Sequence, residues 1–293
     1  MTKYIVSGYI GFDNFGDEAI AKVLTEKLKS KGAEKITLIS SNPVRTAELH
    51  KVNSCSMLRF FKDLKDADVL ISGGGSLLQD VTSLKSLIYY LGVIYTAILL
   101  RKRVEIFAQG IGPINSKTGR FLTQIALKNA SKISVRDKKS QELLKSWNID
   151  SELVQDPVFS LNLPQKNAKG VVGIQLRSFP ALTDKFLEKL AQDVREKFFD
   201  KKIQIISLQD SIDLEVCEKF KRMLDLENAE VLSRLSINDV FEVISNLEYL
   251  IGMRFHANVA AIKCGVKTTA INYDIKVKKL AEEYNLPLIE LNL

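Results

Sequence analysis

The chain has 293 residues, of which 46% are hydrophobic and 26% are charged, and its formal net charge is +7. This is the composition of a globular protein with one large or two medium domains, and it excludes a low-complexity chain. The three cysteines (Cys55, Cys217 and Cys264) are scattered without metal-ligand or redox spacing, so with two histidines they favour no zinc site. Together with the lack of a signal peptide, they predict a cytoplasmic location.

The positive charge is unevenly distributed. Residues 1–160 hold 23 Lys and Arg against 16 Asp and Glu, whereas residues 161–293 hold 19 of each kind. A basic half suits nucleic acid, anionic lipid or phosphorylated substrates. No helix-turn-helix, zinc finger or aromatic-basic RNA motif accompanies it, so we expect no nucleic-acid partner.

Short apolar runs alternate with helical patterns along the chain. Expected strands in the first half are Lys3–Ser7, Lys35–Ser40, Asp68–Ser72, Val104–Gln109 and Ser131–Val135, with a helix near Glu18–Ser30. The second half adds strands at Val171–Leu176, Ile203–Leu208, Ala229–Leu232, Tyr249–Ile251 and Thr268–Asn272, with helices near Thr183–Phe199 and Ser211–Leu226 and after His256. A further element is expected at Asp239–Ser245. The alternation predicts an α/β protein with parallel, doubly wound sheets.

The pattern stops and restarts in the middle of the chain. Asp156-Pro157 and Pro164-Gln165-Lys166-Asn167 mark the break. We therefore predict two Rossmann-like doubly wound domains, at residues 1–162 and 163–293.

One uncharged segment allows two interpretations. Leu87–Leu100 is apolar throughout and is followed by Arg101-Lys102-Arg103. It is too short to span a bilayer comfortably. It is either a helix buried in the first domain or a surface helix that docks on anionic lipid at the inner face of the membrane, with its basic tail on the headgroups.

Two glycine-marked turns follow strands of the first half, where doubly wound sheets bind ligands. Gly8–Glu18 lacks the glycine spacing of a dinucleotide fingerprint and places acids at a helix start, so Asp13, Asn14 or Asp17 would suit neutral hydroxyls, unless they only cap the helix. Ser72-Gly73-Gly74-Gly75 lets the backbone approach a ligand or form an anion-holding nest, although a structural tight turn is the alternative.

Cationic and amide side chains follow other strands. Gln109-Gly110-Ile111-Gly112-Pro113 and Ser134-Val135-Arg136-Asp137 each end a strand. Arg136 either serves a ligand or pairs only with Asp137 or Asp156. Lys276, after the last strand, could reach the same ligand.

Gly252-Met253-Arg254-Phe255-His256 lies where a strand ends and a helix starts. Helix N-termini attract anions, arginine clamps carboxylate or phosphate, and histidine moves protons near neutral pH. The sequence thus predicts an anion site at Arg254 and His256. The alternative is an internal ion pair of Arg254 and a hydrogen-bonded core histidine.

Taken together and in this order, the motifs from Gly8–Glu18 to Gly252–His256 resemble the polysaccharide pyruvyl transferase family, and in particular its cell-wall branch in bacteria with S-layers. The resemblance implies a GT-B-like fold with the site in the interdomain cleft, between an acceptor-side N-terminal domain and a donor-binding C-terminal domain. It implies phosphoenolpyruvate as donor, a sugar or lipid-linked saccharide as acceptor, often N-acetylmannosamine, and a cyclic pyruvyl ketal as product.

The residues fit these roles. Phosphoenolpyruvate carries about three negative charges, so it needs clustered cations. Arg254, Arg136 and Lys276, with the backbone of Gly73, Gly74 and Gly75, are the expected donor-binding residues. We expect His256 to act as general acid–base, Asp13 or Asp17 to orient or deprotonate the diol, and Asn14 and Gln109 to bind the acceptor. No metal and no cofactor is required.

Two other functions compete with this one. A nucleotide-sugar glycosyltransferase of the same architecture would need an acidic residue that grips a ribose, for which Asp274 is the candidate. A non-catalytic membrane-docking or scaffold protein would tolerate loss of His256 and Arg254.

Overall fold

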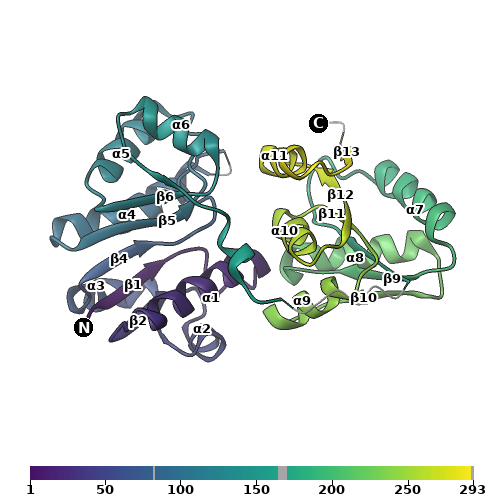
Figure 1. Ribbon diagram of the computed structural model, residues 1–293, viewed down its shortest axis with the longest axis horizontal. Helices are drawn as coiled ribbons and strands as arrows, with labels where there is room; N and C mark the ends of the chain where they lie inside the picture. Colours follow the sequence, from purple (N-terminus) through teal and green to yellow (C-terminus); the bar gives the residue numbers. More distant parts are fainter. Residues whose placement is uncertain (82, 164–169, 292–293) are drawn as a thin grey trace. The chain divides into compact units, whose positions relative to one another are not determined.

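The computed structural model describes residues 1–81, 83–163 and 170–291, and it divides into two compact units, Met1–Ser160 and Leu161–Leu293. The expected break at 164–167 lies outside the described residues. Each unit is a parallel sheet with helices on its faces (Figure 1).

The first unit contains a seven-stranded sheet in the order β3-β2-β1-β4-β5-β6-β7, with every paired strand parallel. Its strands are β1 (Lys3–Ser7), β2 (Lys35–Ile39), β3 (Asn53–Cys55), β4 (Val69–Ser72), β5 (Arg103–Gln109), β6 (Lys132–Val135) and β7 (Glu152–Leu153). Its helices are α1 (Phe15–Ser30), α2 (Pro43–His50), α3 (Met57–Asp66), α4 (Leu84–Leu99), α5 (Lys117–Lys128), α6 (Lys138–Ser146) and the 3-10 turn η1 (Pro157–Ser160).

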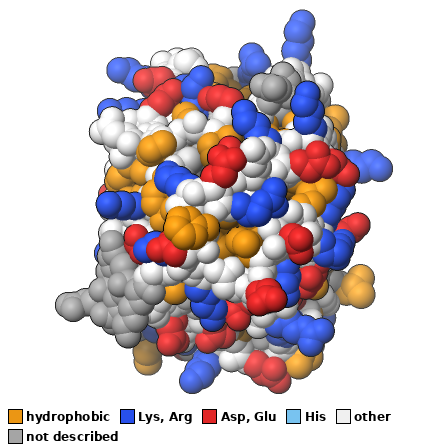
Figure 2. Space-filling model, turned by 90° about the vertical axis from the view of Figure 1, so that its right-hand side faces the viewer, with side chains coloured by type: hydrophobic (Ala, Val, Ile, Leu, Met, Phe, Trp, Pro, Cys, Tyr) orange, Lys and Arg blue, Asp and Glu red, His pale blue; other side chains and the backbone are white. Residues whose placement is uncertain are grey.

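The second unit contains a six-stranded sheet in the order β10-β9-β8-β11-β12-β13, again with all paired strands parallel. Its strands are β8 (Val171–Gln175), β9 (Lys202–Ile206), β10 (Ala229–Leu232), β11 (Tyr249–Gly252), β12 (Lys267–Asn272) and β13 (Leu288–Glu290). Its helices are α7 (Asp184–Phe198), α8 (Asp210–Leu224), α9 (Ile237–Ser245), α10 (Phe255–Lys263) and α11 (Ile275–Tyr284). On the face of this unit shown in Figure 2, acidic and basic side chains are interspersed, as its balanced charge predicts.

Each sheet has one point where the direction of strand addition reverses. In the first unit the chain adds β2 and β3 on one side of β1 and then returns to add β4 on the other side. In the second unit β9 and β10 lie on one side of β8, and β11 lies on the other. Ligands of open α/β sheets bind outside the carboxyl ends of the strands at such switch points. The loops after β1 and β4, and after β8 and β11, are therefore the positions to inspect.

The apolar segment Leu87–Leu100 forms most of α4, and one face of this helix is buried in the core of the first unit. Leu87, Leu91, Ile94 and Ala97 are all at most 2% exposed and pack against the sheet with residues of α3 and α5. The spacing of three and four residues places these side chains on one face of the helix. The opposite side of α4 keeps apolar side chains at the surface, among them Ile88, which is 55% exposed.

The sequence pattern places the main strands within a residue or two of the structure but misses shorter elements. The stretch between β2 and β4 contains α2, β3 and α3, where no element was predicted. Two of these elements are too short to show a clear repeating pattern, since β3 has three residues and α2 has eight. The edge strands β7 and β13, and the helices α5, α6 and α11, were also not predicted.

Candidate active site

The second switch point carries Arg254 between β11 and α10. Arg254 is the residue before the helix and has extended backbone angles, so its side chain leaves the chain where the strand ends. The Asn258 amide donates to the carbonyl oxygens of Gly252 (3.0 Å) and Arg254 (3.1 Å), which fixes the turn from below. The Arg254 backbone N–H donates to Gln175 Oε1 on β8 at 2.6 Å, so the turn is tied to both strands that flank the switch.

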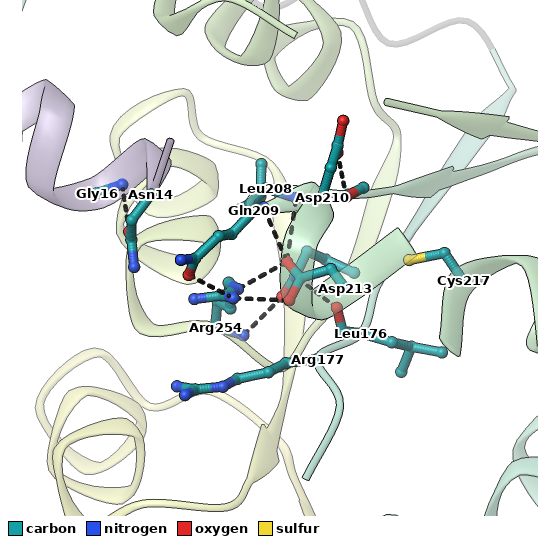
Figure 3. Close-up of polar contacts among 12 residues, drawn as sticks. Asn14, Gly16, Leu176, Arg177, Leu208, Gln209, Asp210, Asp213, Cys217 and Arg254 are labelled. Carbon is teal, nitrogen blue, oxygen red and sulfur yellow. Dashed lines mark hydrogen bonds and ion pairs between the residues drawn. The ribbon is translucent and has the colours of Figure 1, made fainter. Parts of the chain in front are cut away.

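The Arg254 guanidinium is held by a buried carboxylate from α8 (Figure 3). Its Nε donates to Asp213 Oδ2 at 2.7 Å and its Nη2 donates to Asp213 Oδ1 at 2.6 Å, a bidentate pair with the Arg254 and Asp213 side chains 8% and 0% exposed. Nη2 also donates to Gln209 Oε1 at 3.1 Å. The internal ion pair that the sequence left as an alternative is therefore present. Nη1 of Arg254 makes no hydrogen bond to a described residue and remains available to a ligand.

Asp213 also closes the turn between β9 and α8. Its Oδ2 accepts from the backbone N–H groups of Leu208 and Gln209, both at 3.1 Å. One buried side chain thus orients Arg254 and fixes the loop after the neighbouring strand. The sequence signal for Asp213 was its position in the buried stripe of α8, where Val216, Phe220 and Leu224 follow it at helical spacing.

Arg177 lies at the same switch point and was not among the predicted site residues. It follows β8 by two residues, as Arg254 follows β11 by two residues, and the register pairs Gln175 with Gly252. Its guanidinium lies over the Tyr273 ring at 5.6 Å from the ring centroid, and its Nη1 donates to Tyr273 Oη at 3.5 Å. Arg177 makes no ion pair with any described residue.

His256 and Lys276 occupy the first turns of two neighbouring helices of the second unit. His256 is half-buried on α10, with its ring edge-on to Phe255 at 5.0 Å. Lys276 is the second residue of α11, where its Nζ lies 3.7 Å from the Asp274 carboxylate and its backbone N–H donates to the same side chain. The Lys276 side chain is 34% exposed, so this ion pair holds it only weakly in water.

In the first unit, the turns after β4 and β5 form one joined structure. Gly110 N–H donates to the Gly75 carbonyl at 2.8 Å, and the Gln109 amide donates to Ser72 Oγ (2.7 Å) and the Gly73 carbonyl (2.6 Å). Gly75 has a φ of +96°, and a Cβ at this position would lie 2.9 Å from Asp17 Oδ1. The glycine turn therefore leaves room for a close contact, and the Asp17 carboxylate makes that contact.

Arg136 is anchored beside this turn. Its Nη1 donates to Asp156 Oδ2 at 2.7 Å and its Nη2 donates to Ser76 Oγ at 3.1 Å, with both charged side chains about 5% exposed. The pair with Asp156, one of the two partners considered from the sequence, is present. It connects β6, the glycine turn and the segment that precedes η1.

The turn after β1 is held by an interior carboxylate. Glu18 accepts from the Gly11 N–H at 2.7 Å and lies 2.8 Å from His50 Nε2, with the His50 and Glu18 side chains 1% and 5% exposed. The Asn14 side chain caps α1 by accepting from Gly16 N–H at 3.0 Å. Asp13 is half-exposed and pairs with Arg45 of α2 at 2.9 Å.

The two switch points differ in charge. Asp17 follows β1 and lies against Gly75, and its charge contributes, after burial, to a raised pKa of the nearby Tyr90 phenol. Arg177 and Arg254 follow β8 and β11. The first switch point therefore presents a carboxylate and the second presents guanidinium groups. Among residues 1–81, 83–163 and 170–291, no group of three His, Cys, Asp or Glu side chains is placed to hold a metal ion.

The architecture is that of GT-B enzymes. The UDP-N-acetylglucosamine 2-epimerase of Neisseria meningitidis, solved with UDP-N-acetylglucosamine, matches with a TM-score of 0.67 at 11% identity over 99% of this chain and 88% of that one. Staphylococcus aureus MnaA, solved with UDP, gives 0.66 at 9% identity over 100% and 85%. Anabaena HepE, solved with UDP-glucose, gives 0.61 at 14% identity over 100% and 86%. At such identities these matches establish the fold alone.

The fold is thus the two-domain GT-B fold, with charged side chains at both switch points. The sequence pattern of the polysaccharide pyruvyl transferases matches residues 14–275, and the chain belongs to this family. No curated relative of the chain is detected by sequence. The match begins at Asn14, which caps α1, and ends at the first residue of α11, so it covers the loops after β4, β8 and β11 but not β1 or residues 8–13 of the loop that follows it.

Proposed function

We propose that the protein transfers the pyruvyl group of phosphoenolpyruvate to two hydroxyls of one sugar, forming a cyclic ketal and releasing phosphate. The observation that carries the proposal is the guanidinium pair at the second switch point of a chain that belongs to the polysaccharide pyruvyl transferase family. Phosphoenolpyruvate carries a carboxylate and a phosphate ester on the same carbon, C2, and forked arginine donors match both groups.

The donor is assigned to Arg254, Arg136 and Lys276, with the backbone of Gly73, Gly74 and Gly75. The ion pair of Arg254 with Asp213 is compatible with this role, because it fixes the plane of the guanidinium and leaves Nη1 for a ligand oxygen. A guanidinium group that is already held in a fixed orientation loses less conformational entropy when a ligand binds to it. The Arg136 side chain is fixed in the same way by Asp156 and Ser76.

The acceptor is assigned to the carboxylate side of the first unit. A sugar is neutral and offers hydroxyls, which Asp17 and Asn14 can bind without charge repulsion. Asp13, which is half-exposed in its pair with Arg45, is the second acid proposed to orient or deprotonate the diol. Gln109 is fully buried with its amide tied to the glycine turn, so we assign it to shaping that turn against the acceptor.

The chemistry requires one proton to be gained by carbon and two to be lost by hydroxyls. One hydroxyl oxygen bonds to C2 of the donor while C3 takes a proton and becomes a methyl group. The second hydroxyl oxygen then bonds to C2 as the C2–O bond to phosphate breaks. Inorganic phosphate leaves with the remaining proton. His256, in the first turn of α10, is the proposed general acid–base for these transfers.

The test is release of inorganic phosphate from phosphoenolpyruvate that depends on a sugar acceptor, for which we propose an N-acetylmannosamine saccharide in lipid-linked form. His256→Ala is expected to abolish turnover and to keep donor affinity within about threefold, because a proton-transfer group contributes to rate more than to binding. Arg254→Lys is expected to weaken donor binding at least tenfold, since an ammonium cannot keep both bonds to Asp213 and also reach a ligand. Arg222→Ala, which removes an exposed charge from the last turn of α8, is the matched control and should change neither.

A second candidate function is glycosyl transfer from a nucleotide sugar. It is favoured by the structural neighbours solved with UDP compounds and by Asp274, which follows β12. Because a ligand that binds the folded state raises its melting temperature, phosphoenolpyruvate and UDP sugars distinguish the candidates directly. A shift with phosphoenolpyruvate that Arg254→Ala removes supports pyruvyl transfer. A shift with a UDP sugar alone, removed by Asp274→Ala, supports glycosyl transfer.

We also propose that the first unit contacts an anionic membrane surface, where a lipid-linked acceptor would reside. No helix in the described part of the chain has the length and apolarity to cross a bilayer. The exposed apolar side chains of α3 and α4 supply a docking surface, which consists of Met57, Leu58, Phe61, Leu84, Ile88 and Tyr89. Tyr89 Oη donates to Met57 Sδ at 3.5 Å and joins the two helices. Arg101, Lys102 and Arg103 follow α4 and would meet the headgroups.

Flotation with vesicles that contain anionic phosphatidylglycerol tests this contact. The double variant Leu58→Ser and Ile88→Ser should lose binding, because each apolar side chain buried in the interface contributes about 1–3 kcal/mol. Val44→Ser, at a position of α2 that is 72% exposed and lies outside the docking surface, is the control. Unchanged vesicle binding by the double variant would contradict the proposed membrane contact.

A further inference from the structure

The second switch point contains a cation that the fold leaves without a counter-ion. Arg254 is neutralised by Asp213, but Arg177 has no carboxylate partner among the described residues. Its contacts are the Tyr273 ring and hydroxyl. Its Nε is buried and donates to no described residue. A guanidinium that is partly removed from water and lacks an anion is unfavourable unless something supplies the anion.

The surroundings of Arg177 fix where its charge is directed. Tyr273, at the start of the loop after β12, is 6% exposed and packs edge-on against Phe179 at 5.3 Å. The guanidinium lies over this ring with Nη1 at the hydroxyl, so Nε and Nη2 form the edge that remains for a ligand. That edge is the one with which arginine binds a carboxylate or a phosphate through two parallel hydrogen bonds.

Position supports the same conclusion. Gln175 on β8 and Gly252 on β11 lie directly opposite each other. Arg177 comes two residues after Gln175, and Arg254 comes two residues after Gly252. In Figure 3 both guanidinium groups are drawn in the same region, at the ends of these strands. The switch point is where open α/β sheets bind ligands, so both groups are placed for one ligand.

We propose that Arg177 is a donor-binding residue that supplies the net positive charge of the second switch point, and that Arg254 supplies orientation rather than net charge. This inference rests on the proposed function. It assigns an anionic group of phosphoenolpyruvate, its carboxylate or its phosphate, to the Nε–Nη2 edge of Arg177. Arg177 with Tyr273 then forms one wall of the donor site, and Arg254 with Asp213 forms the other.

Titration calorimetry with phosphoenolpyruvate and, separately, with inorganic phosphate tests the proposal on the whole chain. Arg177→Gln should weaken phosphoenolpyruvate binding at least tenfold, and Arg177→Lys should restore only part of it. Arg222→Ala removes the same charge from the far end of α8, about 18 Å along the helix from its first residue, and should leave binding unchanged. Loss of phosphoenolpyruvate binding with phosphate binding retained assigns the carboxylate to Arg177, and loss of both assigns the phosphate.

The outcomes separate this inference from the function on which it rests. If the unaltered protein binds phosphoenolpyruvate and Arg177→Gln binds it equally well, the role of Arg177 is overturned and pyruvyl transfer stands. If the unaltered protein binds inorganic phosphate but not phosphoenolpyruvate, and Arg177→Gln abolishes phosphate binding, the anion site stands and pyruvyl transfer fails. If the unaltered protein binds neither, both are overturned. Melting of the unliganded variant at the temperature of the unaltered protein shows that the substitution leaves the fold intact.

Discussion

Asp213→Asn is the substitution from which we expect the clearest effect on stability. The Asp213 side chain is fully buried and accepts two hydrogen bonds from Arg254 and two from backbone N–H groups at the start of α8. An asparagine keeps one oxygen for the backbone donors but turns an NH₂ group toward the guanidinium. Breaking one partner of a buried ion pair costs about 3–5 kcal/mol, because the remaining charge stays buried without compensation.

A double-mutant cycle isolates the pair from the rest of the site. Arg254→Gln alone leaves the buried carboxylate without its cation and should also cost about 3 kcal/mol. The double variant Asp213→Asn with Arg254→Gln removes both charges, so its loss should fall short of the sum of the single losses by about 2–3 kcal/mol. Asp193→Asn, at an exposed position of α7, is the control and should stay within about 0.5 kcal/mol of the unaltered protein.

Urea unfolding followed by two signals assigns the effect to the second unit. The only tryptophan, Trp147, lies directly after α6 in the first unit, so its fluorescence reports that unit. Far-UV circular dichroism reports both units. We expect the urea midpoint of the transition seen only by circular dichroism to fall and the midpoint of the fluorescence transition to stay unchanged. Single losses below 1 kcal/mol, or losses that add within about 0.5 kcal/mol, would refute the assignment of a buried, coupled pair.

Three further predictions concern single side chains. Gly75 has a φ of +96° and lies against a carboxylate oxygen, so Gly75→Ala should destabilise the first unit by about 1–3 kcal/mol in thermal melts. The control is Gly92→Ala, because the added Cβ meets nothing within 4 Å and the change should be neutral or stabilising. Burial raises the pKa of the Cys217 thiol to about 12. The contribution of this thiol to the free energy of unfolding is therefore full below pH 9 and falls by about 1.4 kcal/mol for each pH unit above 9. In urea unfolding, Cys217→Ala should lose less stability between pH 8 and pH 10 than the unaltered protein does. His50→Ala leaves Glu18 buried without its partner and should lower the melting temperature seen by Trp147 fluorescence by several degrees; no change would contradict the structural role.

The fold and the Arg254 motif could be predicted from the sequence because their signals are local. Alternating apolar runs specify parallel strands, and Gly252–His256 places a cation and a histidine directly at a strand end. For Arg136 the sequence offered two acidic partners, Asp137 and Asp156, and the structure contains the pair with Asp156. What it could not decide was whether such an arginine binds a ligand or an internal acid, because that depends on distances between elements.

Asp213 and Arg177 were missed for different reasons. Asp213 is 41 residues before Arg254, and nothing local connects them. Its signal was indirect: a carboxylate in the apolar stripe of a helix needs a buried partner. Arg177 follows an expected strand, the position at which ligand residues were sought, but it stands alone there without a glycine motif. Only the register of β8 with β11 makes it the counterpart of Arg254.

The two histidines have opposite environments, and this makes the protein unusually simple to follow by magnetic resonance. His50 is enclosed with Glu18 inside the first unit, and His256 is half-buried on the first turn of α10. The ring signals of only two histidines can be assigned by one substitution, His50→Gln. The signals that remain then report, at every stage of a donor titration, what the ligand does to the proposed proton-transfer group.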